Sequence, residues 1–231
     1  MKILAIETST IVASCAICED ESVLASSKIA TGLTHSQTLM VLVDNMFKSA
    51  NIKTEEIGAV AVSIGPGSFT GLRIGIAAAK GISMGLSVPL VGVETLHGLS
   101  YNLLACNSYV CPCLDARNEM VYTAVFENRN FRCERVLEDF VEKKSRLKEI
   151  LKEKKEKVFL VGDAAKDCYE EFKDCENIFL APASLRLPSA CSVGFLGLFK
   201  IKNGCKEEVV PKYLRLSQAE QNRINETNSR K

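Results

Sequence analysis

Residues Lys2–Cys18 read KILAIETSTIVASCAIC: an apolar run, a turn of one acid and three hydroxyl residues, and a second apolar run. This pattern predicts a strand, a polar turn at Glu7–Thr10, and a strand that returns beside the first. The pattern recurs about a hundred residues later, with strands Tyr109–Leu114 and Met120–Glu127 around the turn Asp115–Asn118. A unit repeated at this distance indicates a duplicated β-turn-β core rather than a short-period repeat array.

Strands and helices alternate around each hairpin, which predicts an α/β fold with two linked lobes. A helix capped by Thr34 is expected to run to about Ala50, and a second helix is expected over Thr70–Leu86. The other predicted elements are strands Val23–Ala30, Ile57–Ile64, Pro89–Val93 and Val158–Val161, helices Lys166–Phe172 and Ser192–Ile201, and a solvated helix face within Glu142–Lys157. The predicted division is an N-terminal lobe at 1–105, a C-terminal lobe at 106–215 and a polar tail at 216–231.

The composition excludes several classes of protein. Apolar residues make up 47% of the 231 residues, which excludes an intrinsically disordered chain. The formal net charge of +1 gives no global basic field to bind nucleic acid, so any RNA contact needs a local patch or a partner. No apolar run reaches the roughly 20 residues of a membrane-spanning helix. Because Glu7 interrupts the first apolar run too early for a signal peptide, we expect a cytoplasmic protein with no membrane contact.

The ten cysteines are expected to be thiols, as is usual in the reducing cytosol. Cys15 and Cys18 form a C-x-x-C pair, but their odd separation in a strand sends the side chains to opposite faces. Cys111 and Cys113 could share a face, yet no second pair or nearby histidine completes a zinc set. We therefore expect no metal site and interpret these residues as small apolar core side chains.

The segment Ser63–Gly75 reads SIGPGSFTGLRIG, a strand that enters a glycine-rich turn and then a helix. Amides at the start of such a helix can bind an anion such as a phosphate. The turn lacks the Gly-Lys-Ser/Thr element of a P-loop, and its third glycine comes one residue late for the dinucleotide fingerprint. A tight strand-to-helix corner explains the glycines equally well, so both interpretations stay open.

The two helices of the first half carry a predicted partner interface. Glycine inside a helix costs up to about 1 kcal/mol relative to alanine, so several glycines on one face indicate close approach of another helix. That helix could be the neighbour in the same lobe or a helix of another subunit, and an unusually wide apolar stripe on the first helix favours the latter. The predicted interface residues are Leu39, Val43, Met46, Gly71, Gly75, Ala78 and Ala79. A bulky residue at Gly75 is accordingly predicted to weaken association and leave the monomer folded.

The turn Glu7, Thr8, Ser9 and Thr10 is a candidate contact for a phosphate, a nucleotide or a hydrated cation. Turn and capping preferences of serine and threonine account for these residues equally well. The two histidines, His35 and His97, have no second histidine three or four residues away, and we assign neither a catalytic role.

Five segments in order along the chain resemble one family. They are Ile3–Ser9, Ile64–Gly75, Pro89–Thr95, Leu114–Arg117 and Pro211–Arg215. With the long central motif, they closely resemble the TsaB family (YeaZ-like), the bacterial partner subunit in threonylcarbamoyladenosine modification of tRNA. The resemblance implies the duplicated actin/Hsp70/sugar-kinase (ASKHA) fold, with a mixed sheet and flanking helices in each lobe. This agrees with the repeated hairpin.

The resemblance also implies a role without catalysis. TsaB-like proteins pair through their first two long helices with the longer paralogue TsaD, the threonylcarbamoyltransferase, or with a second copy of themselves. A small ATPase, TsaE, works with the pair, and tRNA contacts this subunit through the complex. No cofactor of its own is implied, although ADP or ATP at the complex interface is compatible with it.

Two departures from related enzymes support this expectation. The His-x-x-x-His metal ligands of TsaD match Thr95 and Leu99 here, with His97 between them. Glu7 stands where the ATPase superfamily usually has Asp. The alternative functions are a nucleotide-dependent enzyme of the ASKHA superfamily and a glycoprotease-like peptidase.

Overall fold

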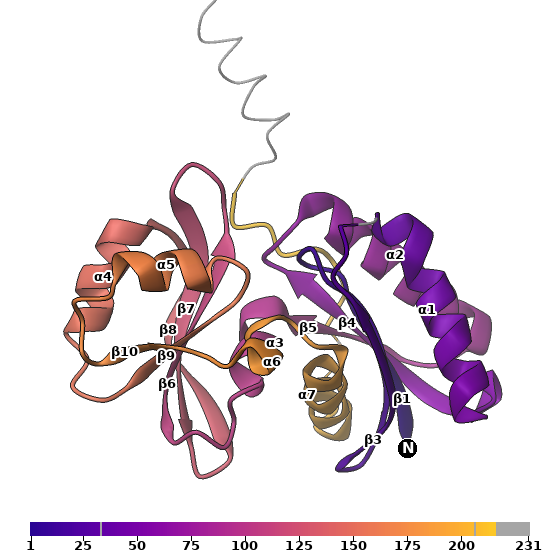
Figure 1. Ribbon diagram of the computed structural model, residues 1–231. Helices are drawn as coiled ribbons and strands as arrows, with labels where there is room; N and C mark the ends of the chain where they lie inside the picture. The colour runs from indigo at the N-terminus through magenta and orange to yellow at the C-terminus, as the bar shows by residue number, and fades with distance from the viewer. Residues whose placement is uncertain (33, 206, 216–231) are drawn as a thin grey trace, which may run out of the picture.

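The computed structural model describes residues 1–32, 34–205 and 207–215, and the predicted polar tail at 216–231 lies outside these residues. Two five-stranded sheets form two lobes that stand side by side (Figure 1). The strands are β1 Lys2–Glu7, β2 Ala13–Glu19, β3 Ser22–Ile29, β4 Ile57–Gly65, β5 Leu90–Glu94, β6 Ser108–Asp115, β7 Met120–Arg129, β8 Arg132–Lys143, β9 Val158–Val161 and β10 Ile178–Leu180. The α-helices are α1 His35–Ala50, α2 Phe69–Leu86, α3 Thr95–Tyr101, α4 Lys144–Lys152, α5 Ala165–Glu171, α6 Ala183–Arg186 and α7 Ala190–Lys202, with a 3₁₀ turn at Thr54–Glu56.

The two sheets have the same topology, which confirms the predicted duplication. The first sheet has the order β3-β2-β1-β4-β5 and the second has the order β8-β7-β6-β9-β10. In each, three antiparallel strands form a meander, and two further strands lie parallel to the first strand of the lobe. Both sheets are therefore mixed, as expected.

Each sheet is covered by helices on both faces. In the first lobe, α1 and α2 pack on one face over Leu4, Ile6 and Val60, and α7 packs on the other over Ile3 and Ala5. In the second lobe, α4 and α5 cover one face and α3 covers the other. The expected C-terminal lobe at 106–215 included α7, whereas this helix packs on the first sheet. The chain thus returns to its first lobe after the second sheet, and the division at residue 105 stays a prediction.

The first two helices follow the expected periodicity. The buried stripe of α1 is Leu39, Leu42, Val43, Met46 and Phe47, spaced three and four residues apart. Thr34 occupies the N-cap position of α1, but its side chain makes no capping hydrogen bond. At the start of α2, the hydroxyl of Ser68 accepts a hydrogen bond from the amide of Gly71 at 3.2 Å.

Other elements were not expected from the sequence, namely β8, α3, β10, α6 and the 3₁₀ turn at Thr54–Glu56. The Lys/Glu-rich segment at 142–157 contains a helix, but this helix is shorter than predicted and begins only after β8 ends at Lys143. Within the described residues, no helix has both the length and the hydropathy needed to cross a membrane.

Candidate functional site

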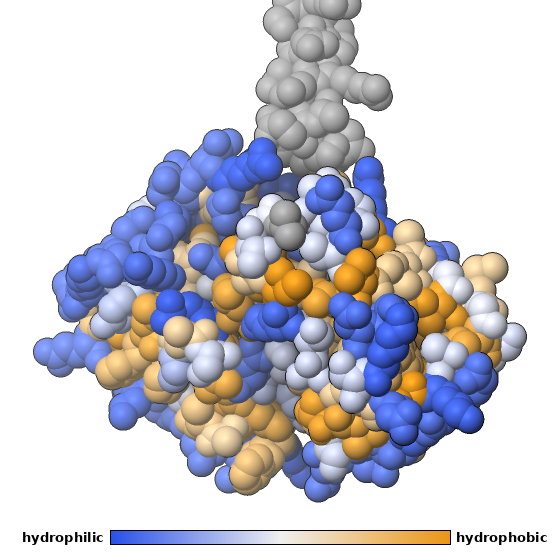
Figure 2. Space-filling view, turned by 45° about the vertical axis from the view of Figure 1, so that its right-hand side comes forward, coloured by the Kyte–Doolittle hydropathy of each residue, from blue (hydrophilic) through white to orange (hydrophobic). Residues whose placement is uncertain are grey.

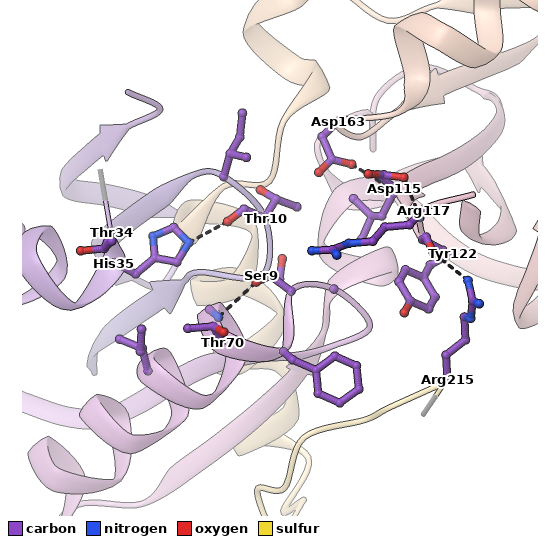
Figure 3. A pocket seen from close by; sticks show the side chains of 18 of the residues that line it. Ser9, Thr10, Thr34, His35, Thr70, Asp115, Arg117, Tyr122, Asp163 and Arg215 are labelled. Atoms are coloured by element: carbon purple, nitrogen blue, oxygen red, sulfur yellow. Dashed lines mark hydrogen bonds between the residues drawn. The ribbon is translucent and has the colours of Figure 1, made fainter. Parts of the chain in front are cut away.

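A cleft of about 640 Å³ opens between the turns of the two repeated hairpins (Figure 3). The first lobe contributes the turn after β1, the start of α1 and the turn into α2, and the second lobe contributes the turn after β6. The polar residues around the cleft include Ser9, Thr10, Thr34, His35, Ser68, Thr70, Asp115, Arg117, Asn118, Tyr122, Asp163 and Arg215. Segments that lie far apart in the sequence therefore meet at one place because the hairpin is duplicated.

The glycine-rich turn packs directly on the first hairpin turn. A Cβ atom on Gly71 would overlap the carbonyl oxygen of Thr8, and one on Gly67 would overlap that of Ser9. The amide of Ser68 donates a hydrogen bond to the Ser9 carbonyl at 2.7 Å, and the Thr8 hydroxyl donates one to the Gly71 carbonyl at 2.8 Å. The glycines thus permit the backbone of this turn to approach that of the first hairpin turn. This contact favours the interpretation of the motif as a tight structural corner.

The four residues of the first turn have different positions. Ser9 and Thr10 line the cleft, whereas Glu7 and Thr8 do not. The Thr8 hydroxyl is used by Gly71, and Glu7 Oε1 accepts a hydrogen bond from the Ser9 amide at 2.6 Å. The Ser9 hydroxyl is buried and has no hydrogen-bond partner among the described residues. A ligand contact at this turn stays a prediction, and the geometry allows it at Ser9 and Thr10.

Glu7 is fully buried, and burial raises the pKa of its carboxyl group above the ordinary value of 4.5 although Ser9 and Ser63 hydrogen-bond to it. The folded protein therefore holds this proton at a pH where the unfolded chain has lost it. Stability linked to Glu7 is present below pH 4.5 and falls as the pH rises from there through the higher folded-state pKa.

Replacing Glu7 with glutamine should therefore stabilise the protein at neutral pH. The glutamine oxygen can still accept the Ser9 amide, and no charge has to be buried, so the expected gain in unfolding free energy at pH 7 is about 1–3 kcal/mol. Urea unfolding of both proteins at pH 4 and pH 7 measures this difference, which should shrink at pH 4. Glu149→Gln, on the exposed side of α4, is the control. A Glu7→Gln protein less stable than the parent at pH 7 would contradict the assignment.

His35 supports the first turn from α1. Its Nε2 lies 2.7 Å from the Thr10 carbonyl oxygen, a bond that requires the proton on Nε2. The imidazole also lies against Gly71, where a Cβ atom would crowd it. The described contacts of His35 are therefore those of a residue that positions the turn.

The second hairpin turn places charged side chains across the cleft. Arg117 points toward the first turn in Figure 3, and its amide donates to Asp115 Oδ1 at 2.8 Å. Asp163 Oδ1 accepts the Asp115 amide at 3.0 Å, and burial, with the nearby Asp115 carboxylate adding to it, raises the pKa of Asp163. Arg215 Nη1 donates to the Ala116 carbonyl at 2.7 Å. This combination of guanidinium, carboxylate and hydroxyl groups suits a small polar ligand bearing an anionic group.

The positions that match the paralogue's metal ligands lie in α3. Thr95 and Leu99 are both buried, at 1% and 0% exposure. Between them, His97 stacks on Phe126 with ring centroids 5.5 Å apart. Burial, followed by the nearby Arg135 guanidinium, lowers the pKa of His97 to about 4, so its ring is neutral at pH 7. Within the described residues, no group of three or more histidine, cysteine or acidic side chains is placed to hold a metal ion.

The predicted partner interface requires a correction. The structure buries Leu39, Val43, Met46, Gly71, Gly75 and Ala79 inside the first lobe and leaves Ala78 half-buried. A Cβ atom on Gly75 would overlap the Thr8 hydroxyl, so the close neighbour of this glycine is the hairpin turn and not another subunit. A bulky residue at Gly75 would therefore disturb the fold of the monomer, contrary to the prediction from sequence.

The outer faces of the same two helices are exposed, and they mix polar residues such as Asp44, Lys48 and Lys80 with a few apolar ones. On α1, Met40 and Val41 are 49% and 57% exposed, and on α2, Met84 is 79% exposed. Beside Met84, a Cβ atom on Gly81 or Gly85 would meet no atom within 4 Å. We call these five residues the outer face. These five residues were not predicted, because the sequence alone did not show which side of each helix faces the sheet.

All ten cysteines are free thiols. Cys15 and Cys18 lie in the cores on opposite faces of the first sheet, as predicted. Burial raises the pKa of each of these two thiols to about 12. Cys111 and Cys113 share one face of the second sheet, with their sulfur atoms 3.9 Å apart.

Known proteins resemble the chain in both sequence and fold. The family described as TsaD: tRNA N6-adenosine threonylcarbamoyltransferase matches residues 29–222. The tRNA threonylcarbamoyladenosine biosynthesis protein TsaB of Bacillus subtilis is 30% identical over 223 residues, which is 95% of this chain and 96% of that protein. The TsaB protein of Escherichia coli is 35% identical over 129 residues, 55% of each chain.

Solved structures define the class of protein. YeaZ from Pseudomonas aeruginosa superposes with a TM-score of 0.79 at 25% identity, covering 92% of this chain and 99% of that one. The ethanolamine utilization protein EutJ from Carboxydothermus hydrogenoformans superposes with a TM-score of 0.55 at 14% identity, covering 85% and 90%. With its two equivalent mixed sheets, the chain is an α/β protein of the duplicated ASKHA class. Within that class it belongs to the TsaB family of tRNA threonylcarbamoyladenosine biosynthesis proteins.

Proposed function

We propose that this chain is the non-catalytic activating subunit of the complex that forms N6-threonylcarbamoyladenosine at position 37 of tRNA. In this proposal it pairs with a TsaD-like threonylcarbamoyltransferase, and a TsaE-like ATPase acts on the pair in the cytoplasm. Family membership supports the pathway. The outer face of α1 and α2 supports the role.

The observation that carries the proposal is the pair of exposed glycines inside α2. In a helix interior, where Gly81 lies, a glycine costs about 1 kcal/mol of helix stability relative to alanine. Gly71 and Gly75 offset this cost by close packing within the lobe, whereas Gly81 and Gly85 have open space where a side chain would be. A helix of another subunit lying across this smooth surface would supply the missing contact.

The surroundings of the two glycines agree with a protein partner. Met84, next to Gly85 on α2, exposes an apolar side chain, and so do Met40 and Val41 on α1. Figure 2 shows hydrophobic and pale residues mixed with hydrophilic ones over the part of the first lobe that carries α1 and α2, and a denser group of hydrophilic residues over the upper part of the second lobe. Exposed apolar side chains are a common feature of interaction sites, and these three agree with a protein partner. In the absence of TsaD, the same surface would pair two copies of this chain.

The site geometry supports a subunit without its own catalysis. The positions of the metal-binding histidines are taken by buried Thr95 and Leu99. The Glu7 carboxyl hydrogen-bonds to its own turn and does not line the cleft. We therefore propose that any ADP or ATP is bound at the interface of the complex, and that tRNA reaches this subunit through its partner.

The experiment that tests the proposed function is reconstitution of threonine incorporation into unmodified tRNA. The mixture contains ATP, the adenylate-forming enzyme, the TsaD-like partner and the TsaE-like ATPase, with or without this protein. We expect product only when this protein is present, together with a stable complex on gel filtration. Full activity without it would refute the proposal. ATP turnover or peptide cleavage by the isolated chain would instead favour the enzyme alternatives.

A further inference from the structure

After α7, the chain crosses from the first lobe to the second over residues Val209–Arg215, between the two lobes in Figure 1. We propose that this segment, the strap, is a clasp that fixes the two lobes relative to each other, with Lys212 as its ionic link. The inference concerns the chain alone and is independent of the function proposed above.

The first part of the strap is fastened to the first lobe. Val209 is 5% exposed and belongs to the core beneath α1 and α2. The Lys212 amide donates to the Ile64 carbonyl at the end of β4, at 2.7 Å. The Tyr213 ring stacks on Phe69 of α2 with centroids 4.2 Å apart. Two hydrophobic contacts and one backbone bond thus attach this end.

Arg73 and Gly65 strengthen the same attachment. Arg73 Nε donates to the Tyr213 hydroxyl at 2.9 Å, and its guanidinium lies 5.7 Å from the centroid of that ring. At Gly65, where φ is +113°, a Cβ atom would come within 2.6 Å of the Lys212 carbonyl oxygen. The glycine therefore allows the strap to lie directly on the turn that leads to α2.

The last part of the strap is fastened to the second lobe. Leu214 packs against the core cluster that includes Leu114 and Ala116. Arg215 Nη1 donates to the Ala116 carbonyl at 2.7 Å, in the second hairpin turn. A run of seven residues thus attaches to one lobe at its start and to the other at its end.

Lys212 joins both lobes through its side chain. Its Nζ lies 2.6 Å from Glu94 Oε1, at the end of β5 in the first lobe, and 2.9 Å from Asp139 Oδ2, on β8 in the second. Arg135 of β8 pairs with the same two carboxylates. Two cations thus balance two anions at the lobe junction, where the Asp139 side chain is 1% exposed.

The electrostatics of the junction explain why water is a poor substitute for the Lys212 ammonium group. Burial alone would raise the pKa of Glu94, but the Lys212 ammonium and the Arg135 guanidinium outweigh it and lower the pKa. Removing one cation from such a cluster leaves a buried carboxylate without full compensation, which is strongly destabilising for the contacts around it. Loss of the Lys212 side chain should therefore weaken the whole contact between the two lobes and not just one surface ion pair.

The test is Lys212→Met in the full chain, followed by hydrogen exchange and small-angle X-ray scattering. We expect exchange to rise about tenfold or more in the strap, in the turn at 115–118 and in β8 around Asp139, with no change in α1 and α4. The radius of gyration should increase as the lobes separate. Lys202→Met is the matched control, because Lys202 forms an exposed ion pair with Asp20 at 3.4 Å, away from the junction.

Unchanged exchange and an unchanged radius of gyration would overturn the proposal. So would a uniform rise in exchange that includes α1 and α4, since that would show a loss of general stability only. If Lys212→Met does not fold, Tyr213→Leu removes the stacking on Phe69 and the bond from Arg73, and it should give the same regional pattern. Lys212→Arg, which keeps the charge, should restore most of the protection.

Discussion

Replacing Gly81 of α2 with leucine is expected to abolish pairing with the TsaD-like partner and self-association of the chain. A built Cβ atom at this position meets nothing within 4 Å, so the monomer can accept the side chain. A partner helix packed against the glycine cannot, because helices approach closely only where side chains are small. Overpacking of this kind costs about 1–3 kcal/mol or more. The dissociation constant should therefore rise by up to about 100-fold or more.

The measurement is the dissociation constant by titration calorimetry, together with unfolding of the isolated chain. The monomer should become slightly more stable, because leucine favours a helix by most of 1 kcal/mol relative to glycine. Glu149→Leu is the matched control, since it adds the same side chain to an exposed helix position of the second lobe. If Gly81→Leu binds the partner as tightly as the parent chain, the outer face is not the pairing surface.

Much of the fold could be predicted from the sequence, because the spacing of apolar residues along a short segment indicates whether it forms a helix or a strand. The two hairpins and both long helices lie within about two residues of their predicted bounds. Strand β8 was missed because its pattern does not alternate cleanly between apolar and polar residues. Arg135 and Asp139 occupy its inward positions and are paired with each other and with Lys212 and Glu94. Ionic pairing of this kind depends on residues far away in sequence.

The faces of α2 illustrate what the sequence could not show. Small residues occur at both buried and exposed positions of this helix: Gly71, Gly75 and Ala79 are buried, and Gly81 and Gly85 are exposed. Their local patterns are alike. Contacts with Thr8, more than sixty residues earlier in the chain, show that Gly71 and Gly75 are internal. The predicted interface residues therefore lie mainly on the inner side of these two helices, and pairing through the helices stays a prediction.

Alanine at Gly71 and alanine at Gly81 are expected to have opposite effects on stability. Both substitutions lie in α2, and both gain about 1 kcal/mol of helix propensity. At Gly71 the added methyl group would overlap the Thr8 carbonyl oxygen and crowd His35, and neither backbone nor ring can yield without moving the hairpin turn. The expected loss at Gly71 is about 3 kcal/mol or more, typical of severe overpacking in a core. The expected change at Gly81 is a gain of up to about 1 kcal/mol.

Urea unfolding of the two variants measures both effects under the same conditions. Gly71→Ala should also change the cleft, because the displaced turn carries Ser9 and Thr10. A stable Gly71→Ala protein would show that the glycine-rich motif does not hold the first hairpin turn. The motif would then have to be explained by a ligand at the start of α2. The sign of this one substitution thus decides between the two interpretations that the sequence left open, a tight structural corner and an anion site.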